Sequence, residues 1–418
     1  MQSSPFKVMI IGAGAGGLCL AQGLKADGVA VEVFERDLTP SDRPQGYRLS
    51  IRGAGGAALK ACLPSALFER LVENSARPSQ GLTFLDHRAK RLLAVDFPPM
   101  DRLAAETERP ISRIALRRVL LDGLDDIVRF GKRFTAFADA PAGGVTARFA
   151  DGFSSTGDVL VGADGAGSPV RAQLLPHARR VETGVMIVSG KFSMRDGARA
   201  DIPPAIWRGP TLILGPGGRF LFANGVEFGA APDPEIPPED RGGYVMWGFS
   251  ARRETFAAFG DIEALGGEAL RRAVLAQVDD WSPAIRAMVE RADPATLVAF
   301  PARTSVPIPP WKTGHVTLLG DALHNMTPYQ GVGANTALRD AAALRRALVA
   351  VSRRQQALIP ALAAYERDMI DYGFRAVRGS LEQMERLHAR SPLARAATRM
   401  FFRVADRIPP LKAAFLAG

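Results

Sequence analysis

Three glycine-rich loops hold the residues whose types and spacing could bind a phosphate-containing ligand. In the first loop, Gly12, Gly14 and Gly17 are spaced as GxGxxG between an apolar strand and a helix, and Glu35 closes the next strand. Gly12 permits a tight turn, Gly14 lets backbone approach a pyrophosphate, and Gly17 lets the helix pack closely on the strand. Free N–H groups at the helix start attract phosphates, and Glu35 can accept hydrogen bonds from a ribose. We therefore expect a bound dinucleotide; the alternative is a glycine-rich turn that has lost its ligand.

The second and third loops repeat this design, because each leaves a strand, is rich in glycine and leads into a helix. Asp164 and Gly165 lie in GADGAGSPVR after the strand 158–161, and Asp321 follows the buried strand 316–319. In an open α/β sheet such loops gather at the carboxyl ends of the strands, where ligands bind. We expect the Asp321 carboxylate to be held rigidly and to accept hydrogen bonds from ligand hydroxyl groups.

The stretch after Asp321 has features that suit a flat ring. Pro328 fixes the loop, while Gly331 and Gly333 allow a ring to lie against bare backbone. Asn335 is expected to begin a long helix whose N-terminus points at that ring and stabilises negative charge on it. His324 in the same loop could donate a proton or tune binding, but a structural histidine that braces the loop is the favoured interpretation.

Two arginines are further candidate ligands. Arg36 follows the second strand directly and could reach an adenine or a pyrophosphate; a solvated surface arginine is the alternative. Ser112 is a candidate N-cap, which puts Arg113 in the first turn of a helix. A cation is unfavourable there without an anionic partner, so Arg113 is a candidate phosphate ligand. Arg117 is its neighbour one turn later, and an ordinary solvated helix face is the alternative for both.

The elements that position these residues fall into two kinds. Around the three loops, short apolar runs alternate with segments whose apolar residues have helical spacing. This alternation predicts a parallel α/β sheet. From Val181 to about Ala299 the pattern changes to strands separated by turn signals. This change predicts an antiparallel sheet that forms a separate layer.

Composition limits the function classes. With 47% hydrophobic and 23% charged residues, the 418-residue chain is globular and long enough for two or three regions. The net charge of +10 is not clustered, so no nucleic-acid partner is expected. Cys19 and Cys62 offer neither a disulfide framework nor metal-ligand spacing, so no metal is expected. We find no signal peptide and no apolar run of membrane-spanning length, so we expect the cytoplasm as the compartment.

The C-terminal stretch Pro392–Phe415 is basic and amphipathic. Packing on the core or in a dimer is the favoured interpretation. A helix at a membrane surface is the alternative.

Taken together, these motifs resemble the single-component FAD-dependent aromatic monooxygenases, the class that includes p-hydroxybenzoate hydroxylase. The resemblance rests on GAGAGG (12–17) with Glu35, the DG pair at Asp164, GDALHNMTP (320–328), QGVGAN (330–335) and the segment around Arg113. Within the family the chain is similar to the tetracycline-inactivating and salicylate-hydroxylase-like branches. QGVGAN departs from the GQG-containing loop of many relatives, which leaves the local backbone of that loop open.

The resemblance implies an α/β fold class: a Rossmann-like FAD-binding domain, an inserted antiparallel-sheet substrate domain and C-terminal helices. The implied domains are discontinuous. The FAD-binding domain would comprise 1–75, 102–180 and 296–345, the substrate-binding domain 76–101 and 181–295, and the C-terminal helical region 346–418.

Roles for the candidate residues follow from the same resemblance. Glu35 and Arg36 would hold the adenosine half of FAD, and Arg113 would contact the pyrophosphate region. Asp321 would bind the ribityl chain or the pyrophosphate, and the loop Pro328–Asn335 would back the isoalloxazine ring.

The implied reaction uses NADPH or NADH and O₂ to hydroxylate an aromatic or polycyclic small molecule through a flavin C4a-hydroperoxide. Asp164 would support both FAD and a docking NADPH. The protein need not supply a nucleophile, because the cofactor carries the difficult chemistry. The chain would act as a monomer or homodimer.

One face of the strand Tyr244–Ser250 should line the substrate cavity above the flavin. Met246 lies on one face and Trp247 on the other, and the sequence leaves open which face points inward. Phe220 and Phe222 offer a second wall. Because these side chains are apolar, an aromatic or polycyclic substrate is expected rather than a small acid.

Three other functions compete with this interpretation. Another flavoenzyme of the same fold would be an epoxidase, a halogenase or a reductase; the WxWxIP motif expected of a halogenase is missing, and PIPPW at 307–311 does not replace it. The Asp321 loop argues against a plain NAD-dependent dehydrogenase. A non-catalytic partner protein that keeps FAD for structure is supported only by the basic C-terminal helix.

Overall fold

A computed structural model describes residues 5–40, 48–99, 101–194, 199–228 and 243–412. The chain divides into two compact units. The first unit comprises Met1–Ser75, Arg102–Val181 and Arg303–Leu381, and the second comprises Ala76–Asp101, Glu182–Ala302 and Glu382–Gly418.

The first unit is built on a five-stranded parallel sheet in the order β17-β11-β1-β2-β7. Its strands are β1 (Lys7–Ile11), β2 (Ala30–Phe34), β7 (Val128–Arg129), β11 (Val159–Gly162) and β17 (Val316–Leu318). The side chains of Val8, Met9 and Ile10 are fully buried, because both faces of a parallel sheet are covered. Smaller antiparallel sheets comprise β3 (Arg48–Ile51) with β6 (Arg109–Ser112), and β8 (Phe134–Asp139), β9 (Val145–Phe149) and β10 (Ser154–Gly157).

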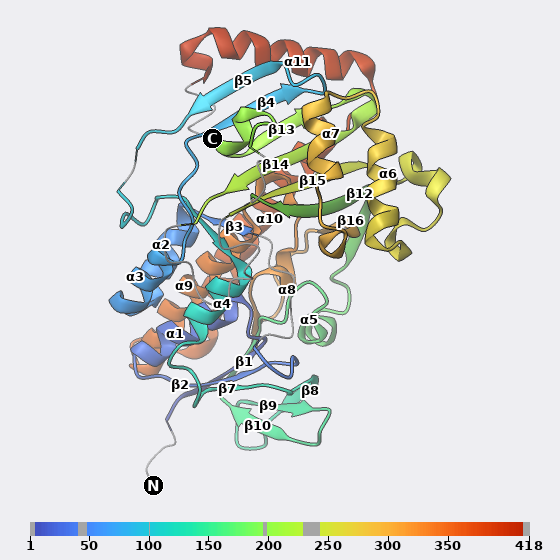
Figure 1. Cartoon of the computed structure of the whole chain (residues 1–418). Coiled ribbons are helices and arrows are strands. Elements are labelled where there is room, and N and C mark those ends of the chain that lie inside the picture. The colour runs from blue at the N-terminus through green and yellow to red at the C-terminus, as the bar shows by residue number, and fades with distance from the viewer. Residues whose placement is uncertain (1–4, 41–47, 100, 195–198, 229–242, 413–418) are drawn as a thin grey trace. The chain divides into compact units, whose positions relative to one another are not determined.

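Helices of the first unit pack around α9, the long helix that follows the third glycine-rich loop. Both α1 and α2 contact α9, and all three contribute to one apolar core with the parallel sheet (Figure 1). The helices are α1 (Ala15–Ala26), α2 (Ala54–Cys62), α3 (Ser65–Glu73), α4 (Arg113–Leu121), α5 (Pro169–Leu174), α8 (Asp321–His324), α9 (Gly333–Ser352) and most of α10 (Leu358–Leu387).

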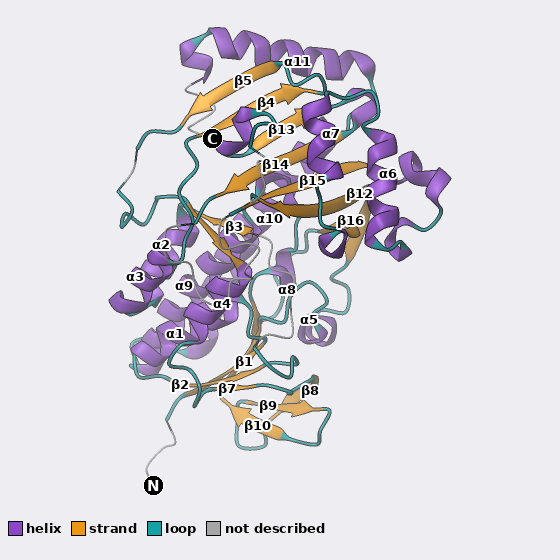
Figure 2. Ribbon diagram, viewed as in Figure 1, coloured by secondary structure: helices purple, strands orange, loops and turns teal. Residues whose placement is uncertain are grey.

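A seven-stranded sheet organises the second unit, in the order β16-β12-β15-β14-β13-β4-β5 (Figure 2). Its strands are β4 (Gly81–Asp86), β5 (Arg91–Asp96), β12 (Arg180–Ser193), β13 (Thr211–Leu214), β14 (Phe220–Val226), β15 (Tyr244–Arg252) and β16 (Val298–Ser305). The β13–β4 pair is parallel, whereas β12–β15, β14–β15, β13–β14 and β4–β5 are antiparallel. The predicted antiparallel sheet is therefore mixed, because the early segment 76–101 contributes two strands beside β13.

Three helices cover parts of this sheet. The helices α6 (Gly267–Gln277) and α7 (Pro283–Glu290) bury apolar side chains against one face. The helix α11 (Pro392–Arg407) contacts the edge strand β5, as Figure 1 shows in red. The expected packing of this C-terminal helix on the core is thus observed; residues 413–415 of the predicted stretch lie outside the described residues.

The expected α/β fold class is confirmed: a Rossmann-like parallel sheet, a second unit with its own sheet, and C-terminal helices. The C-terminal helices do not form a region of their own. The first unit takes α10 up to Leu381, and the second takes the rest of α10 with α11.

A buried acid in the first unit generates a stability prediction. Glu366 on α10 is buried, and Thr313 Oγ1 donates a hydrogen bond of 2.5 Å to its Oε2. Burial raises the pKa of the Glu366 carboxyl to about 7 from an ordinary value of 4.5. The folded state therefore binds this proton more tightly than the unfolded state, so stability falls as pH rises from about 4.5 through about 7.

We expect Glu366→Gln to remove this part of the pH dependence while keeping an acceptor for Thr313. Above neutral pH the variant should be more stable than the parent by about 2–3 kcal/mol, and the gap should close in acid. Urea unfolding of both proteins across this pH range measures the difference. Equal pH dependence in the two proteins would contradict the burial argument.

Candidate functional site

The three glycine-rich loops follow three neighbouring strands of the first unit. Ile11 at the end of β1 pairs with Gly162 of β11, and Gly162 pairs with Leu318 of β17. Because the three strands are parallel, their carboxyl ends share one edge of the sheet. The structure therefore brings the loops together, although they are far apart in the sequence.

The first loop is shaped by its glycines. Gly12 has φ +108°, and a Cβ there would lie 2.5 Å from the carbonyl oxygen of Ala163. A Cβ on Gly17 would lie 2.3 Å from the carbonyl oxygen of Gly12, so only glycine lets the helix approach the strand. Gly14 precedes α1, and a Cβ there would meet nothing within 4 Å. The helix start has no side-chain cap and no acid in its first turn, so its N–H groups are available to an anion.

Glu35 is buried at the end of β2 and braces this loop. Its Oε2 accepts a hydrogen bond of 2.7 Å from the Ala13 N–H, and its Oε1 accepts one of 3.0 Å from the Asp37 N–H. Arg117 lies 3.7 Å from Glu35 Oε2 and 3.2 Å from Asp37 Oδ2. Arg117 is therefore a partner of these carboxylates and not a solvated arginine, whereas Arg36 is exposed.

Arg113 is the first residue of α4 and is exposed. Ser112 caps this helix as predicted, because its side chain accepts a hydrogen bond of 3.1 Å from the Ala115 N–H. Among the described residues Arg113 has no ion pair, which leaves its charge available for an anionic ligand.

The second loop carries a half-buried acid, Asp164, whose carboxylate has spare acceptor capacity. Asp164 Oδ2 accepts a hydrogen bond of 3.3 Å from the Val170 N–H, while its buried Oδ1 accepts none from the described residues. Burial raises the pKa of the Asp164 carboxyl. Gly165 beside it has a left-handed backbone, φ +79°. Arg171 links this loop to the third one, because its Nη1 donates to Ala166 O (2.9 Å) and Ala322 O (3.1 Å).

Asp340 on α9 holds the third loop. This fully buried carboxylate accepts hydrogen bonds from the Gly320 N–H (2.7 Å), His324 Nε2 (2.7 Å) and the Tyr372 hydroxyl (2.6 Å). Burial lowers the pKa of His324, but the charge and hydrogen bond of Asp340 outweigh it, so the net pKa is raised. His324 is thus a buried bracing residue, as the favoured interpretation held. Sequence reasoning missed Asp340; the available signal was a single acid on the apolar face of a long helix.

The remaining residues of the third loop are placed as follows. Asp321 is exposed at the start of α8, and Pro328 is exposed at the start of a 3-10 helix. Gly331 has φ +64°, and Gly333 is the first residue of α9. The predicted helix start at Asn335 is therefore two residues late.

Asn335 has a different task from the one expected at a helix start. Its Oδ1 accepts a hydrogen bond of 2.9 Å from the Arg52 N–H, and its Nδ2 donates one of 2.9 Å to Ser50 O. The amide thus joins the start of α9 to the end of β3 and the residue that follows it.

In the second unit, the two faces of β15 differ. Trp247 is fully buried in one apolar core with side chains of α6 and α7, so it is removed from the proposed pocket. Met246 and Phe222 lie on the opposite face and are half-buried. Phe220 shares that face but is buried, with its ring 6.2 Å from the His388 ring.

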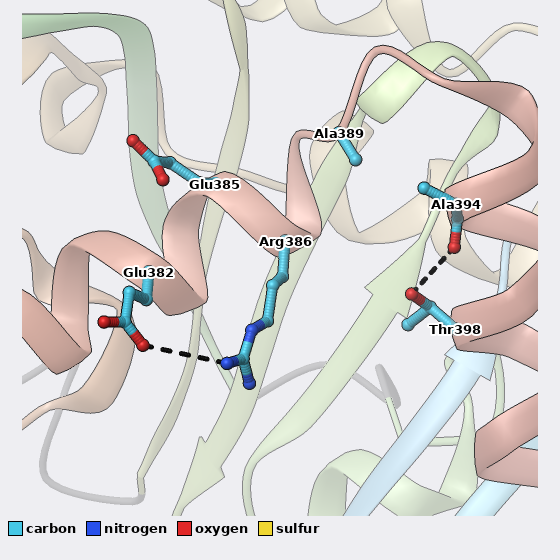
Figure 3. Close-up of a pocket in the computed structure, with 6 residues that line it drawn as sticks. All are labelled: Glu382, Glu385, Arg386, Ala389, Ala394 and Thr398. Atoms are coloured by element: carbon cyan, nitrogen blue, oxygen red, sulfur yellow. Dashed lines mark hydrogen bonds and ion pairs between the residues drawn. The ribbon is translucent and has the colours of Figure 1, made fainter.

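A cavity of about 390 Å³ lies in the second unit between α10 and α11. Figure 3 shows its lining: Glu382, Glu385, Arg386, Ala389, Ala394 and Thr398. Arg386 pairs with Glu382 at 3.7 Å, and Thr398 Oγ1 donates to Ala394 O at 3.0 Å. None of the candidate residues lines this cavity.

Comparisons with known proteins agree with the geometry. The "FAD binding domain" family matches residues 281–380, and the "NAD(P)-binding Rossmann-like domain" family matches residues 10–56. The aurachin C monooxygenase/isomerase of Stigmatella aurantiaca is 30% identical over 378 residues, which are 89% of this chain and 87% of that protein. A solved structure from Photorhabdus luminescens subsp. laumondii TTO1, described as an FAD containing monooxygenase, is 32% identical with a TM-score of 0.81, covering 91% of this chain and 98% of that one.

This chain belongs to the FAD-dependent monooxygenases. A further relative, the dual O-methyltransferase/FAD-dependent monooxygenase CTB3 of Cercospora beticola, is 32% identical over 381 residues. These residues are 82% of this chain but 42% of that relative, so the chain spans less than half the length of the first curated relatives it matches. The expected cofactor is FAD, in agreement with the matched family.

The residues of this chain fit FAD. The uncapped N–H groups of α1 suit a pyrophosphate, and the open space at Gly14 admits it. The buried Asp164 Oδ1 has no hydrogen-bond partner in the described part of the chain, and a ligand hydroxyl or amide could supply one. No group of three or more His, Cys, Asp or Glu side chains that could hold a metal occurs among the residues that the structure describes.

Substitutions at two glycines of the first loop should affect different properties, the stability of the fold at Gly17 and the binding of FAD at Gly14. In the apoprotein, Gly17→Ala should lower the free energy of unfolding by about 1–3 kcal/mol, because its methyl group clashes with backbone. Gly14→Ala should cost less than about 1 kcal/mol but weaken FAD binding at least about tenfold, because its methyl group occupies the approach of the pyrophosphate. Urea unfolding and FAD fluorescence titration measure the two effects. Undiminished FAD affinity in Gly14→Ala would exclude this assignment.

The Asp340–His324 pair predicts a pH dependence of stability. Because the folded-state pKa of His324 is raised above 6.5, its contribution is complete below the unfolded pKa and is lost as pH rises through the folded one. His324→Gln should lose this decline at alkaline pH and be less stable than the parent by at least about 1 kcal/mol near pH ~6. The exposed His177→Gln serves as the control. A parallel pH profile for the parent and His324→Gln would contradict the ion pair.

Proposed function

We propose that this monooxygenase oxidises NADPH or NADH and uses O₂ to hydroxylate an aromatic or polycyclic small molecule. The observation that carries the proposal is the match over 91% of the chain to a solved structure described as that of an FAD containing monooxygenase. FAD, when bound, supplies the redox chemistry; the protein supplies binding, orientation and exclusion of water.

The proposed cofactor position follows the loops. The N–H groups of α1 would bind the pyrophosphate, Glu35 and Arg36 the adenosine, and Arg113 a phosphate. Asp321 would accept hydrogen bonds from the ribityl chain. Pro328, Gly331 and Gly333 would lie against the isoalloxazine ring, with the α9 N-terminus stabilising negative charge on it.

An anionic nicotinamide nucleotide is the proposed electron donor. Arg180 lies within electrostatic range of both Arg171 and Arg303, and the carboxylates of Asp164 and Asp321 interact with Arg171 and Arg180, respectively. Such a group attracts phosphates. The Rossmann-like match at residues 10–56 does not argue for a second dinucleotide site, because it covers the loop assigned to the ADP half of FAD.

We propose that the substrate contacts the sheet face that bears Phe222 and Met246. Both side chains are apolar and half-buried on the face opposite α6 and α7. An apolar lining favours a flat, apolar substrate. The name of the aurachin C monooxygenase/isomerase supports an oxygenation reaction in this part of the family. Two free buried cysteines support a reducing compartment such as the cytoplasm.

A substrate screen tests the proposal. The FAD-loaded protein is incubated with NADPH or NADH, ¹⁸O-labelled dioxygen and a panel of aromatic and polycyclic compounds. We expect one substrate class to accelerate NAD(P)H oxidation and to gain one ¹⁸O atom, as measured by mass spectrometry. A product whose new oxygen comes from water, or flavin that neither nucleotide reduces in the presence of any compound, would contradict the proposal.

A further inference from the structure

The outer face of α11 and the residues just after it expose a continuous apolar stripe. Leu393 is 82% exposed, Met400 61%, Val404 40% and Ile408 41%. Their spacing of seven and four residues keeps Leu393, Met400 and Val404 on one side of α11, and Ile408 follows four residues later as the C-cap residue. Such a stripe normally faces a core, so its exposure needs a physical reason.

The opposite side of α11 is already occupied by the sheet of the second unit. Phe402 stacks on Phe84 with ring centroids 4.2 Å apart, and Ala405 is fully buried. Asp406 Oδ1 accepts a hydrogen bond of 3.1 Å from the Ala94 N–H of edge strand β5, and Arg91 lies 3.3 Å from Asp406 Oδ2. The helix is therefore anchored through one face, and the stripe is a second apolar face.

A further contact fixes the rotation of the helix. Arg399 Nη2 donates to the carbonyl oxygens of Leu214 (3.2 Å) and Gly215 (3.1 Å). Turning the stripe inward would break this contact together with those of Phe402 and Asp406. The stripe therefore stays outward while the sheet is intact.

Basic side chains flank the stripe. Arg403 and Arg407 are exposed, lie on one border of the stripe by helical spacing, and have no ion pair with a described residue. Between Pro392 and Lys412 there are five cations and one acid, Asp406. An apolar stripe beside uncompensated arginines is the pattern of a helix that lies in the headgroup region of an anionic bilayer.

We propose that α11 docks this chain on the surface of a membrane containing anionic phospholipids. Met400, Val404 and Ile408 enter the boundary between headgroups and acyl chains, while Arg403 and Arg407 bind lipid phosphates. Charge favours this occupant over a second copy of the chain, because pairing two stripes would bring two helices of net positive charge together. Docking of this kind needs no span, and no helix of the described residues is long and apolar enough to cross a membrane.

Co-sedimentation of the FAD-loaded full chain with lipid vesicles tests the proposal. Phosphatidylcholine vesicles are compared with vesicles that also contain phosphatidylglycerol, at low and high salt. We expect binding to the anionic vesicles to be at least about tenfold stronger and to weaken with salt. Met400→Gln with Val404→Gln should weaken it about tenfold or more, and Arg403→Gln with Arg407→Gln should weaken it and flatten the salt dependence.

Ile359→Gln is the matched control, because it removes an exposed aliphatic side chain from α10 and should leave vesicle binding unchanged. Flavin content and thermal unfolding confirm that each variant is folded. Failure of the parent to bind anionic vesicles would overturn the proposal, as would variants of the stripe that bind like the parent. A dimer in sedimentation velocity that Met400→Gln with Val404→Gln dissociates would assign the stripe to a second copy instead.

Discussion

The buried carboxylate of Asp340 is the interaction on which the candidate site depends. Asp340 lies on α9, yet its three donors come from the loop after β17, from His324 in α8 and from Tyr372 in α10. A carboxylate without water must find such partners, because an unpaired buried charge costs several kcal/mol. The same contacts therefore satisfy the charge and fix the third loop at the carboxyl edge of the parallel sheet. Arg171 connects the third loop to the second one through hydrogen bonds to the carbonyl oxygens of Ala166 and Ala322.

Close packing around α1 imposes the complementary constraint. The strand, the second loop and the helix approach so closely that Gly12 and Gly17 tolerate no Cβ atom, whereas Gly14 faces open space. Glu35 holds the turn through the Ala13 N–H and so stiffens the place where the helix N–H groups are exposed. A rigid, uncapped helix start beside open space is a pre-organised anion site, which is what a dinucleotide requires.

Local patterns in the sequence were sufficient to predict the parallel sheet, the three loops and the Ser112 cap, because glycine spacing and strand–helix periodicity are short-range signals. The role of Asp340 could not be predicted from local patterns, because its partners Gly320 and Tyr372 lie 20 and 32 residues away in the sequence. The contacts of the Asn335 amide were not predictable for the same reason, because this amide binds backbone groups 283 and 285 residues away. The alternation of side chains along β15 predicted two faces of the strand but not which face is buried. The packing of α6 and α7 places Trp247 in the core.

The most direct test of this account is the electron density of FAD in crystals of the holoenzyme. The account predicts the pyrophosphate at the N-terminus of α1, the adenosine ribose beside Glu35 and the isoalloxazine ring against Gly331 and Gly333. A flavin ring bound away from the third loop, or an adenosine half that does not contact Glu35, would contradict the single site formed by the three loops.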